Sequence, residues 1–449
     1  MAGTSGPMTV STKLQRIAKL AREAPGMAIT TLAHHVDLDF LHEAHRRTRK
    51  SGAPGVDGQT AEEYAKDLKG NLQSLLERFK SGTYRAPPVR RVHIPKGDGS
   101  ETRPIGVPTF EDKVLQRAVS MLLEAVYEQD FLDCSYGFRP RRSVHQALEA
   151  LWQQSKRRGG WVLEVDIKGF FDSLGHNHLR AILDQRVRDG VLRRTIDKWL
   201  KAGVQEDGSL SFPDSGSPQG GVVSPVLANV YLHAVVDKWF EDEIKPRLEG
   251  AAFMIRYADD VVIVFASVRD ARQVKAVLPK RFGRFGLAVH PKKTRLVSFR
   301  RPRPRTRGKG SDDWGTPPQD FNFLGFTHHW GRARKGKWVV QRKTDPSRVR
   351  QKLRLIAEWC RRNRHKPIKE QQTTLAQKLR GHFAFYGITG NSKALSSFRH
   401  WVVRTWKRWL DRRSQRARMG WDKFNKLLRR YPLPPARAVH SVLRYAANP

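Results

Sequence analysis

The chain has 449 residues, of which 39% are hydrophobic, enough for a large core and roughly two to four domains. Lys and Arg number 84 against 43 Asp and Glu, a net charge of +41, so nucleic acid is the expected partner and an anionic membrane surface is the alternative. No apolar run reaches the length of a membrane span, and Cys134 and Cys360 lie in no metal-ligand spacing, which argues against a disulfide framework or a structural zinc and favours a reducing compartment.

The first predicted elements are basic helices over residues 10–50, followed by a Gly-rich turn at 51–60. The leucine spacing then predicts one amphipathic helix over 61–80, with an apolar face of Leu68, Leu72, Leu75, Leu76 and Phe79. The next expected elements are a strand with a turn (VRRVHIP, KGDGSE, TRPIGVP) and two long helices, at 89–107, 110–128 and 143–156.

A β-like apolar run over 161–166 ends in Asp166, and a β-hairpin is expected over 253–266. Helices are predicted at 176–189, 193–202, 222–243 and 270–285. Residues 301–449 are mostly helical in pattern and hold 37 Lys and Arg against 8 Asp and Glu, which indicates a separate basic module. This order predicts an α+β domain followed by an all-α one.

Three aspartates are the candidates for catalysis. Asp259 and Asp260 lie on the turn of the predicted hairpin, where two carboxylates repel each other unless a cation lies between them; an exposed Asp-Asp turn is the alternative. Asp166 supplies a third carboxylate at the end of a strand. Such a set suits two Mg²⁺ ions, or Mn²⁺ in their place, for in-line phosphoryl transfer.

Seven blocks, in order along the chain, resemble the reverse transcriptases encoded by bacterial group II introns. They are RPIGVP (103–108, after IPKGDG), CSYGFRPRRSVHQAL (134–148), VLEVDIKGFFDSL (162–174), SPQGGVVSPVLANVYLH (217–233), YADD (257–260), LAVHPKKTRLV (287–297) and FNFLGF (321–326). SGAPGVDGQT at 51–60 resembles the N-terminal extension of the intron enzymes. The resemblance implies an RNA-directed DNA polymerase that binds its intron RNA, assists splicing as a maturase, and copies RNA into DNA during intron mobility, with dNTPs, an RNA template and a DNA primer or target as further partners.

The same resemblance implies a right-hand polymerase: fingers and a palm with an antiparallel sheet and helices, then an all-α thumb and maturase module. The expected domains are an N-terminal extension, fingers, a palm with a basic insertion near 300–318, and the thumb with the maturase module, at 1–85, 86–160, 161–340 and 341–449. A bacterial cytoplasmic location, with the nucleoid or a ribonucleoprotein, is implied as well.

Site residues follow from the matching motifs. Asp166 and Asp259 are expected to bridge both metals with Asp260 beside them, and Ile167 to offer its backbone carbonyl. Lys293 resembles a lysine that protonates the pyrophosphate leaving group, although the adjacent Lys292 leaves the choice open.

Four further residues are expected to contact the incoming nucleotide. Lys96 and Arg103 resemble the fingers cations that bind the triphosphate, and Gln219 resembles the residue that packs on the nucleotide or the template base. Phe171 stands at the position that excludes a ribose 2′-hydroxyl, with a core aromatic as the alternative.

In the C-terminal module, tryptophans alternate with cations that are predicted to bind RNA: Arg399, Arg404, Lys407, Arg408, Arg412 and Arg413. The helical spacing of Val402, Trp406 and Trp409 places some of these tryptophans in the core. LRGHFAFYGITGN (379–391) and PLPPARAVHS (432–441) resemble the intron maturase segment.

Two other functions remain open. One is a domesticated, stand-alone reverse transcriptase used in defence or DNA repair, and the other is a polymerase-dead RNA-binding splicing factor, against which the intact carboxylates argue. An RNA replicase would share the carboxylates but not Phe171. Nothing in the chain resembles the Cys/His DNA-endonuclease domain of many relatives, so priming from nascent or existing DNA ends is expected.

Overall fold

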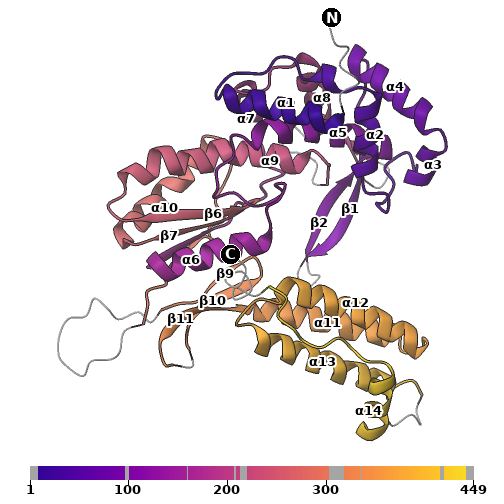
Figure 1. Ribbon diagram of the computed structural model, residues 1–449, viewed down its shortest axis with the longest axis vertical. Coiled ribbons are helices and arrows are strands. Elements are labelled where there is room, and N and C mark those ends of the chain that lie inside the picture. The colour runs from indigo at the N-terminus through magenta and orange to yellow at the C-terminus, as the bar shows by residue number, and fades with distance from the viewer. Residues whose placement is uncertain are drawn as a thin grey trace, which may run out of the picture. The chain divides into compact units, whose positions relative to one another are not determined.

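The computed structural model describes residues 9–96, 101–158, 160–206, 209–212, 220–302, 318–333, 335–414 and 419–440. They belong to two compact units, Met1–Leu296 and Val297–Pro449 (Figure 1). Within the described ranges, no helix is both long and apolar enough to cross a membrane.

The first unit opens with the helices α1 (Val10–Glu23), η1 (Ala33–His35) and α2 (Leu38–Arg47). The single helix expected at 61–80 is wrong, because the structure has two, α3 (Ala61–Ala65) and α4 (Leu68–Ser81). The carboxylate of Asp67 accepts a hydrogen bond from the Gly70 N–H (3.1 Å), which starts a new helix in the middle of the apolar pattern.

The segment 89–107, expected to be a strand with a turn, forms two antiparallel strands, β1 (Val89–Lys96) and β2 (Glu101–Val107). Two short strands, β4 (Val204–Glu206) and β5 (Ser209–Ser211), extend it into a sheet of order β2-β1-β4-β5. β4 runs parallel to β1.

A second sheet, of order β6-β7-β3-β8, carries the predicted carboxylates. Its strands are β3 (Trp161–Val165), β6 (Ala252–Tyr257), β7 (Asp260–Phe265) and β8 (Arg295–Ser298). The hairpin expected over 253–266 is confirmed as β6–β7, and β3 pairs antiparallel with β7. Figure 1 shows α6 (Val144–Arg158) and α10 (Val268–Gly283) beside this sheet.

The helix expected at 222–243 is continuous but not uniformly α-helical. α9 (Ser224–Leu232) passes into two π-helical turns, η2 (His233–Asp237) and η3 (Trp239–Ile244), and a short 3₁₀ turn, η4 (Lys245–Arg247). π-helical turns inside helices are frequent at functional sites. The first of these turns carries the fully buried Asp237.

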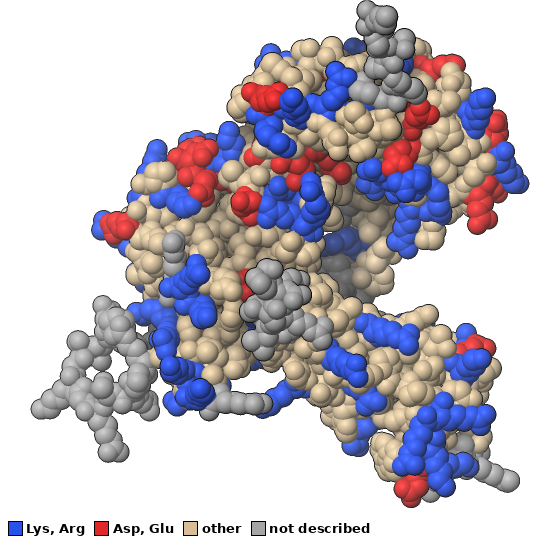
Figure 2. Space-filling model, in the orientation of Figure 1, with Lys and Arg blue, Asp and Glu red and all other residues tan. Residues whose placement is uncertain are grey.

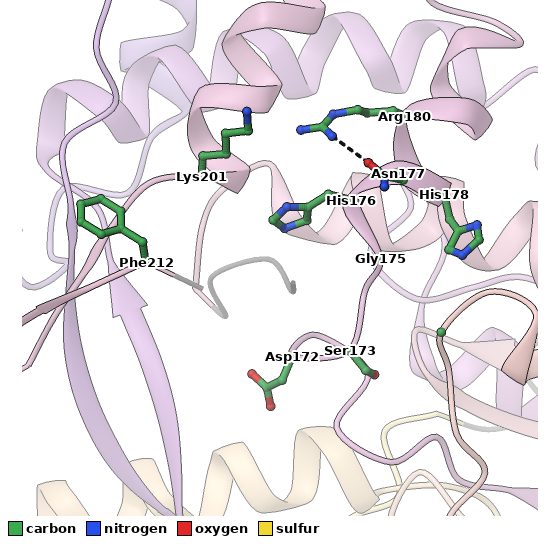
Figure 3. Close-up of a pocket in the computed structure, with 10 residues that line it drawn as sticks. Asp172, Ser173, Gly175, His176, Asn177, His178, Arg180, Lys201 and Phe212 are labelled. Carbon is green, nitrogen blue, oxygen red and sulfur yellow. Dashed lines mark hydrogen bonds between the residues drawn. The ribbon is translucent and has the colours of Figure 1, made fainter. Parts of the chain in front are cut away.

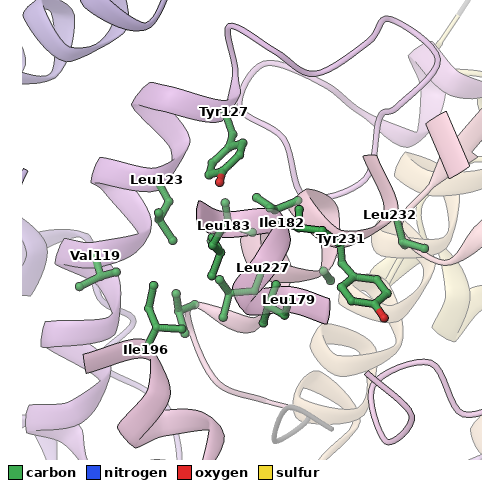
Figure 4. Packing of buried hydrophobic residues seen from close by; sticks show 14 of the residues in the cluster. Val119, Leu123, Tyr127, Leu179, Ile182, Leu183, Ile196, Leu227, Tyr231 and Leu232 are labelled. Atoms are coloured by element: carbon green, nitrogen blue, oxygen red, sulfur yellow. The ribbon is translucent and has the colours of Figure 1, made fainter. Parts of the chain in front are cut away.

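Helices form the core beside the second sheet. α5 (Phe110–Tyr127), α7 (His176–Asp184), α8 (Gly190–Leu200) and α9 meet around aliphatic side chains that include Leu123, Leu183 and Leu227, each at most 1% exposed (Figure 4). Burial of a leucine side chain contributes about 1.5–3 kcal/mol. This core fixes α5 and α9 relative to each other, and both helices support the site described below.

The second unit begins with a three-stranded sheet that the sequence patterns did not predict. β9 (Phe321–Phe323), β10 (Phe326–Arg332) and β11 (Trp338–Thr344) are antiparallel neighbours. The helices that follow are α11 (Pro346–Arg362), α12 (Ile368–Tyr386), α13 (Ser392–Leu410) and α14 (Trp421–Arg430). The helical character expected for the C-terminal segment therefore holds from α11 onward, whereas this unit as a whole is mixed.

Candidate active site

Strand register brings Asp166 to the tip of the β6–β7 hairpin. Val165, the last residue of β3, pairs with Val261 in β7. In an antiparallel ladder the next residue, Asp166, therefore lies alongside Asp260, the first residue of β7. Tyr257 pairs with Asp260, which leaves Ala258 and Asp259 as the two residues of the turn. Two segments almost a hundred residues apart in sequence thus present their carboxylates at one edge of one sheet.

The turn itself has an unusual backbone. Ala258 has φ +57°, in the left-handed region that residues with a Cβ rarely adopt. Gly137 packs against it so closely that a Cβ there would lie 2.2 Å from the Ala258 nitrogen. The glycine of the CSYGF block is therefore required by the close approach of two backbones.

A buried arginine, Arg256, is hydrogen bonded to the turn that contains Ala258 and Asp259. Arg256 is 0% exposed and makes a two-pronged ion pair with Asp237, with Nε–Oδ1 and Nη2–Oδ2 distances of 2.7 and 2.6 Å. The guanidinium also donates to the Asn229 side chain (2.9 Å), to the Ser135 hydroxyl (2.7 Å) and to the Ala258 carbonyl (3.0 Å). All five of its donors are thereby directed, and one bond ends on the turn that bears Asp259.

Electrostatics at the carboxylates favour a cation. Burial raises the pKa of Asp259, and the charge of Asp166 acts in the same direction, while Arg103 and Arg256 oppose the shift. Burial alone would also raise the pKa of Asp237, but the charge of Arg256 outweighs it and holds that pKa below its usual value. The supporting ion pair is thus ionised, whereas burial disfavours the negative charge of the turn carboxylate.

Lys293 lies at Asp166. Its Nζ is 3.7 Å from an Asp166 carboxylate oxygen, and 64% of its side chain is exposed. Residues on both sides of Lys293 are hydrogen bonded to the Asp166 backbone: the His290 N–H donates to the Asp166 carbonyl (2.8 Å), and the Asp166 N–H donates to the Thr294 hydroxyl (3.1 Å). These hydrogen bonds hold the Lys293 backbone in place beside the Asp166 carboxylate.

The backbone at Ile167 leaves an oxygen available. Ile167 forms an antiparallel bridge with Val289, and its two hydrogen bonds use the Asp166 carbonyl and the Lys168 N–H. The Ile167 carbonyl is therefore not consumed by this bridge. Across the described ranges, no three His, Cys, Asp or Glu side chains converge as a ready-made metal cluster. Asp259 is half-buried and its pKa responds to the charge of Asp166, whereas Asp260 is exposed.

Of the four residues predicted to contact the nucleotide, the structure describes the side chains of Arg103 and Phe171. Arg103 is exposed on β2, opposite Ile94, and its charge reaches Asp259. Phe171 is half-buried, with its ring in an edge-to-face contact with Phe170 at 5.1 Å. Lys96 ends β1, but its side chain and the whole of Gln219 lie outside the described residues.

A pocket of about 880 Å³ opens beside Asp172 and Ser173, the two residues that follow Phe171 (Figure 3). Asp172 and Ser173 face it from one side, while Lys201 at the end of α8 and Arg180 on α7 come from the other. Arg180 is hydrogen bonded to Asn177 (3.0 Å). Asp166, Asp259 and Asp260 do not line this pocket.

The six predicted RNA-binding cations separate into two groups. Arg399, Lys407 and Arg413 are satisfied inside the unit: Arg399 donates to the Pro434 carbonyl (2.9 Å), Lys407 to Asp411 (2.7 Å) and Arg413 to the Arg364 carbonyl (2.6 Å). The other three are exposed and lie four residues apart: Arg404, Arg408 and Arg412. The first two lie on α13 and the third just past its end, so they continue one helical face.

Tryptophans accompany the exposed arginines. Arg404 lies over the Trp401 ring at 5.7 Å, and Arg408 and Arg412 flank Trp409 at 5.9 and 5.3 Å. Trp406, by contrast, is 0% exposed and donates to the Gln371 side chain (3.0 Å), as its spacing with Val402 predicted. On the face shown in Figure 2, Lys and Arg predominate over Asp and Glu on the C-terminal helices.

Comparison with known proteins agrees with this arrangement. The family model of the reverse transcriptase (RNA-dependent DNA polymerase) matches residues 94–328, which contain the β3 strand, the β6–β7 hairpin and all seven sequence blocks. The chain belongs to the reverse transcriptase family. The resemblance inferred from the motifs is thereby confirmed, and the mixed α+β fold of the matched region agrees with it.

Individual relatives narrow the family further. The group II intron-encoded protein LtrA of Lactococcus lactis subsp. cremoris is 37% identical over 226 residues, 49% of this chain and 37% of LtrA. Protein YkfC of Escherichia coli is 34% identical over 303 residues, 60% of this chain and 79% of YkfC. The mitochondrial nuclear intron maturase 4 of Arabidopsis thaliana is 28% identical over 162 residues, 36% of this chain and 20% of the maturase. The alignment thus spans little more than a third of LtrA, and two of these relatives are a group II intron protein and an intron maturase by name.

Sequence reasoning missed the residues that support this reverse transcriptase site. Arg256 carried a signal, because it is the one charge within the otherwise apolar run Phe253–Tyr257. Its partners Ser135 and Asn229 lie within two of the seven sequence blocks, but no local pattern indicated that they contact Arg256, and Asp237 lies outside all the blocks.

Proposed function

We propose that the chain is an RNA-directed DNA polymerase of a group II intron, which binds the intron RNA, assists its splicing and copies it into DNA. The observation that carries the proposal is the register of β3 on β7, which sets Asp166 beside the Asp259 turn. Family membership and the intron-encoded relatives support the choice of template and client RNA.

The donors suit two divalent cations. The carboxylates of Asp166, Asp259 and Asp260, with the Ile167 carbonyl, are the hard oxygen ligands that Mg²⁺ prefers. The raised pKa of Asp259 supports this assignment, because a buried carboxylate near a second one is stabilised by a cation between them. Such ions, when bound, activate the primer 3′-hydroxyl and neutralise charge on the triphosphate.

The remaining roles belong to the chain's own side chains. Lys293, tethered at Asp166, is proposed to deliver a proton to the pyrophosphate as it leaves. Arg103, exposed on β2, and Lys96 at the end of β1 are proposed to bind the triphosphate oxygens. Phe171 is proposed to exclude the ribose 2′-hydroxyl, and Gln219 to pack on the nucleotide.

The proposed organisation is that of a right hand. The extension and fingers correspond to 1–85 and 86–160, the palm to 161–340, and the thumb with the maturase module to 341–449. The antiparallel sheet β6-β7-β3 supports the palm assignment. The arginine face of α13 supports RNA binding by the last segment, since exposed cations beside aromatic rings suit phosphates and unpaired bases.

The test is primer extension on an RNA template. Asp259→Asn should abolish dNTP incorporation, because the variant loses one of the carboxylates that would hold the metals, while RNA affinity stays near that of the wild type. A control variant, Asp133→Asn, removes an exposed carboxylate elsewhere in the first unit and should leave incorporation unchanged. Full activity of Asp259→Asn would refute the site, and a wild type without dNTP incorporation would refute the function.

A further inference from the structure

A line of buried polar side chains runs from α8 through α5 to the start of α9. Asp112 and Gln116 lie one turn apart on α5 and are 2% and 3% exposed. Trp199 on α8 and Tyr84 before β1 complete the group at 4% and 2%. None of these residues belongs to the carboxylate site, yet four buried polar side chains in contact represent a substantial desolvation cost.

Every hydrogen bond in this line has a fixed direction. One Asp112 oxygen accepts from the Trp199 indole N–H (2.7 Å) and from the Tyr84 hydroxyl. Its other oxygen accepts from the Gln116 amide NH₂ (2.9 Å). The Gln116 amide oxygen in turn accepts from the backbone N–H groups of Val222 (2.6 Å) and Val223 (3.3 Å). Because backbone N–H groups can only donate and an ionised carboxylate can only accept, the orientation of the Gln116 amide is determined at both ends.

The segment held by this line approaches β2. Gly220 has φ +114°, and a Cβ added there would lie 2.5 Å from the Gly106 carbonyl oxygen and 2.6 Å from Ile105 on β2. Arg103, the candidate triphosphate ligand, lies on that same strand. Residues Gly220–Val223 are therefore fixed on one side by Gln116 and pressed on the other against β2.

We propose that Asp112 and Gln116 are positioning residues for nucleotide binding: their directional hydrogen bonds fix Gly220–Val223 against β2 and so set the strand that presents Arg103. This rests on the proposed polymerase function and deepens it. The line joins α5, the β2 face and the N-terminus of α9, three elements that must keep their relative places while a dNTP binds. Burial raises the pKa of Asp112 to about 6, although the donors Tyr84, Trp199 and Gln116 act in the opposite direction.

The fixed direction of these hydrogen bonds allows a test in which a second substitution compensates for the first. In Asp112→Asn, the new side-chain NH₂ faces the NH₂ of Gln116, so two donors meet. If the Gln116 amide turns so that its oxygen accepts from the new NH₂, its own NH₂ then faces the Val222 N–H, and two donors meet there instead. In Gln116→Glu, two carboxylates face each other instead. In the double variant Asp112→Asn/Gln116→Glu, the new amide at position 112 donates to the new carboxylate at position 116. That carboxylate still accepts from Val222 and Val223, so each donor again meets an acceptor.

Primer extension by the full chain, with one dNTP varied, measures KM and kcat for each variant beside its melting temperature. Asp112→Asn and Gln116→Glu should each raise the KM for dNTP roughly tenfold or more, with a smaller effect on kcat, and the double variant should recover most of the loss. Gln116→Met, which removes the acceptor without adding a donor, should also raise KM and covers the case in which a single variant does not fold.

The outcomes separate the two proposals. Lower melting temperatures with unchanged KM in folded variants, or a double variant no better than the worse single one, would overturn the positioning role and leave a merely structural one. A wild-type chain that incorporates no dNTP would instead overturn the polymerase function itself.

Discussion

Arg256 shows how a single buried charge can set the geometry of the turn that bears Asp259, a proposed metal ligand. Its pair with Asp237 is fully enclosed, and three further donors hold Ser135, Asn229 and the Ala258 carbonyl. Breaking one side of such a pair leaves an uncompensated buried charge, which costs about 3–5 kcal/mol. Arg256 thus helps to position Asp259, although it is not itself one of the proposed metal ligands.

We expect Asp237→Leu to destabilise the chain by about 3–5 kcal/mol, measured by chemical denaturation. The double variant Arg256→Met/Asp237→Leu should regain much of that stability, because no charge remains buried. It should nevertheless stay nearly inactive in primer extension, since the hydrogen bond to the Ala258 carbonyl is missing. A stable and fully active double variant would contradict this positioning role of Arg256.

Phe171 is half-buried rather than enclosed, which suits a side chain that contacts both the core and a substrate. Phe171→Ala should improve ribonucleotide incorporation relative to dNTP incorporation by about tenfold to a hundredfold, because the space beside the sugar opens. Phe171→Tyr retains the ring and should keep the selectivity of the wild type. The measurement is the ratio of kcat/KM for dATP and ATP, and an unchanged ratio in Phe171→Ala would assign the ring to packing alone.

At the scale of elements, α13 divides its cations between structure and surface. Arg399, Lys407 and Arg413 close the unit by binding its own oxygens, whereas Arg404, Arg408 and Arg412 line an exposed face with two tryptophans. From the sequence, all six cations were predicted to bind RNA, because all are Arg or Lys in the same segment. Only their contacts distinguish them.

Replacing Arg404, Arg408 and Arg412 together by Gln should weaken RNA binding and reduce the slope of log K against log salt by about 2 to 3, as three phosphate contacts are lost. The charge-matched control replaces Arg399, Lys407 and Arg413 by Gln. We expect that control to lower the melting temperature more and the salt slope less. Equal slopes for the two triple variants would show that RNA responds only to net charge.

At the scale of the whole molecule, buried histidines make the stability depend on pH, and two of them lie in the C-terminal unit. The C-terminal unit buries His328 and His382, whose ring nitrogens find no hydrogen-bond partner among the described residues. Each ring stacks on an aromatic neighbour instead, His328 on Phe321 at 4.6 Å and His382 on Phe398 at 3.8 Å. Burial lowers the pKa of His328 to about 3 and that of His382 to about 4.

A histidine whose pKa is lower in the folded than in the unfolded chain stabilises the fold fully above about pH 6.5, and the contribution is lost as the pH falls from there toward the folded pKa. The melting temperature should therefore fall between about pH 7 and pH 5.5, before most carboxylates titrate. Hydrogen exchange should locate the loss in β10 and α12. His328→Phe should flatten this pH dependence, and a variant curve parallel to that of the wild type would contradict the assignment.

Local sequence patterns are sufficient to predict several elements and the order of the candidate residues along the chain. The apolar strand ending in Asp166, the hairpin around Asp259 and the strand pair carrying Arg103 could be predicted, because their alternation and turn signals are local. The family followed from seven short blocks for the same reason. The break between α3 and α4 and the strands β9–β11 were missed, because a helix cap and short strands leave weaker periodic signals.

Tertiary structure alone decided which groups support that chemistry. Arg256 meets Asp237 and Ser135, and Gln116 meets Val222, across 19, 121 and 106 residues of chain. No local pattern encodes such pairs, since they depend on the helices packing around one core. The same holds on α13, where burial and neighbouring oxygens, rather than residue type, separate the cations that hold the unit together from those left to bind a partner.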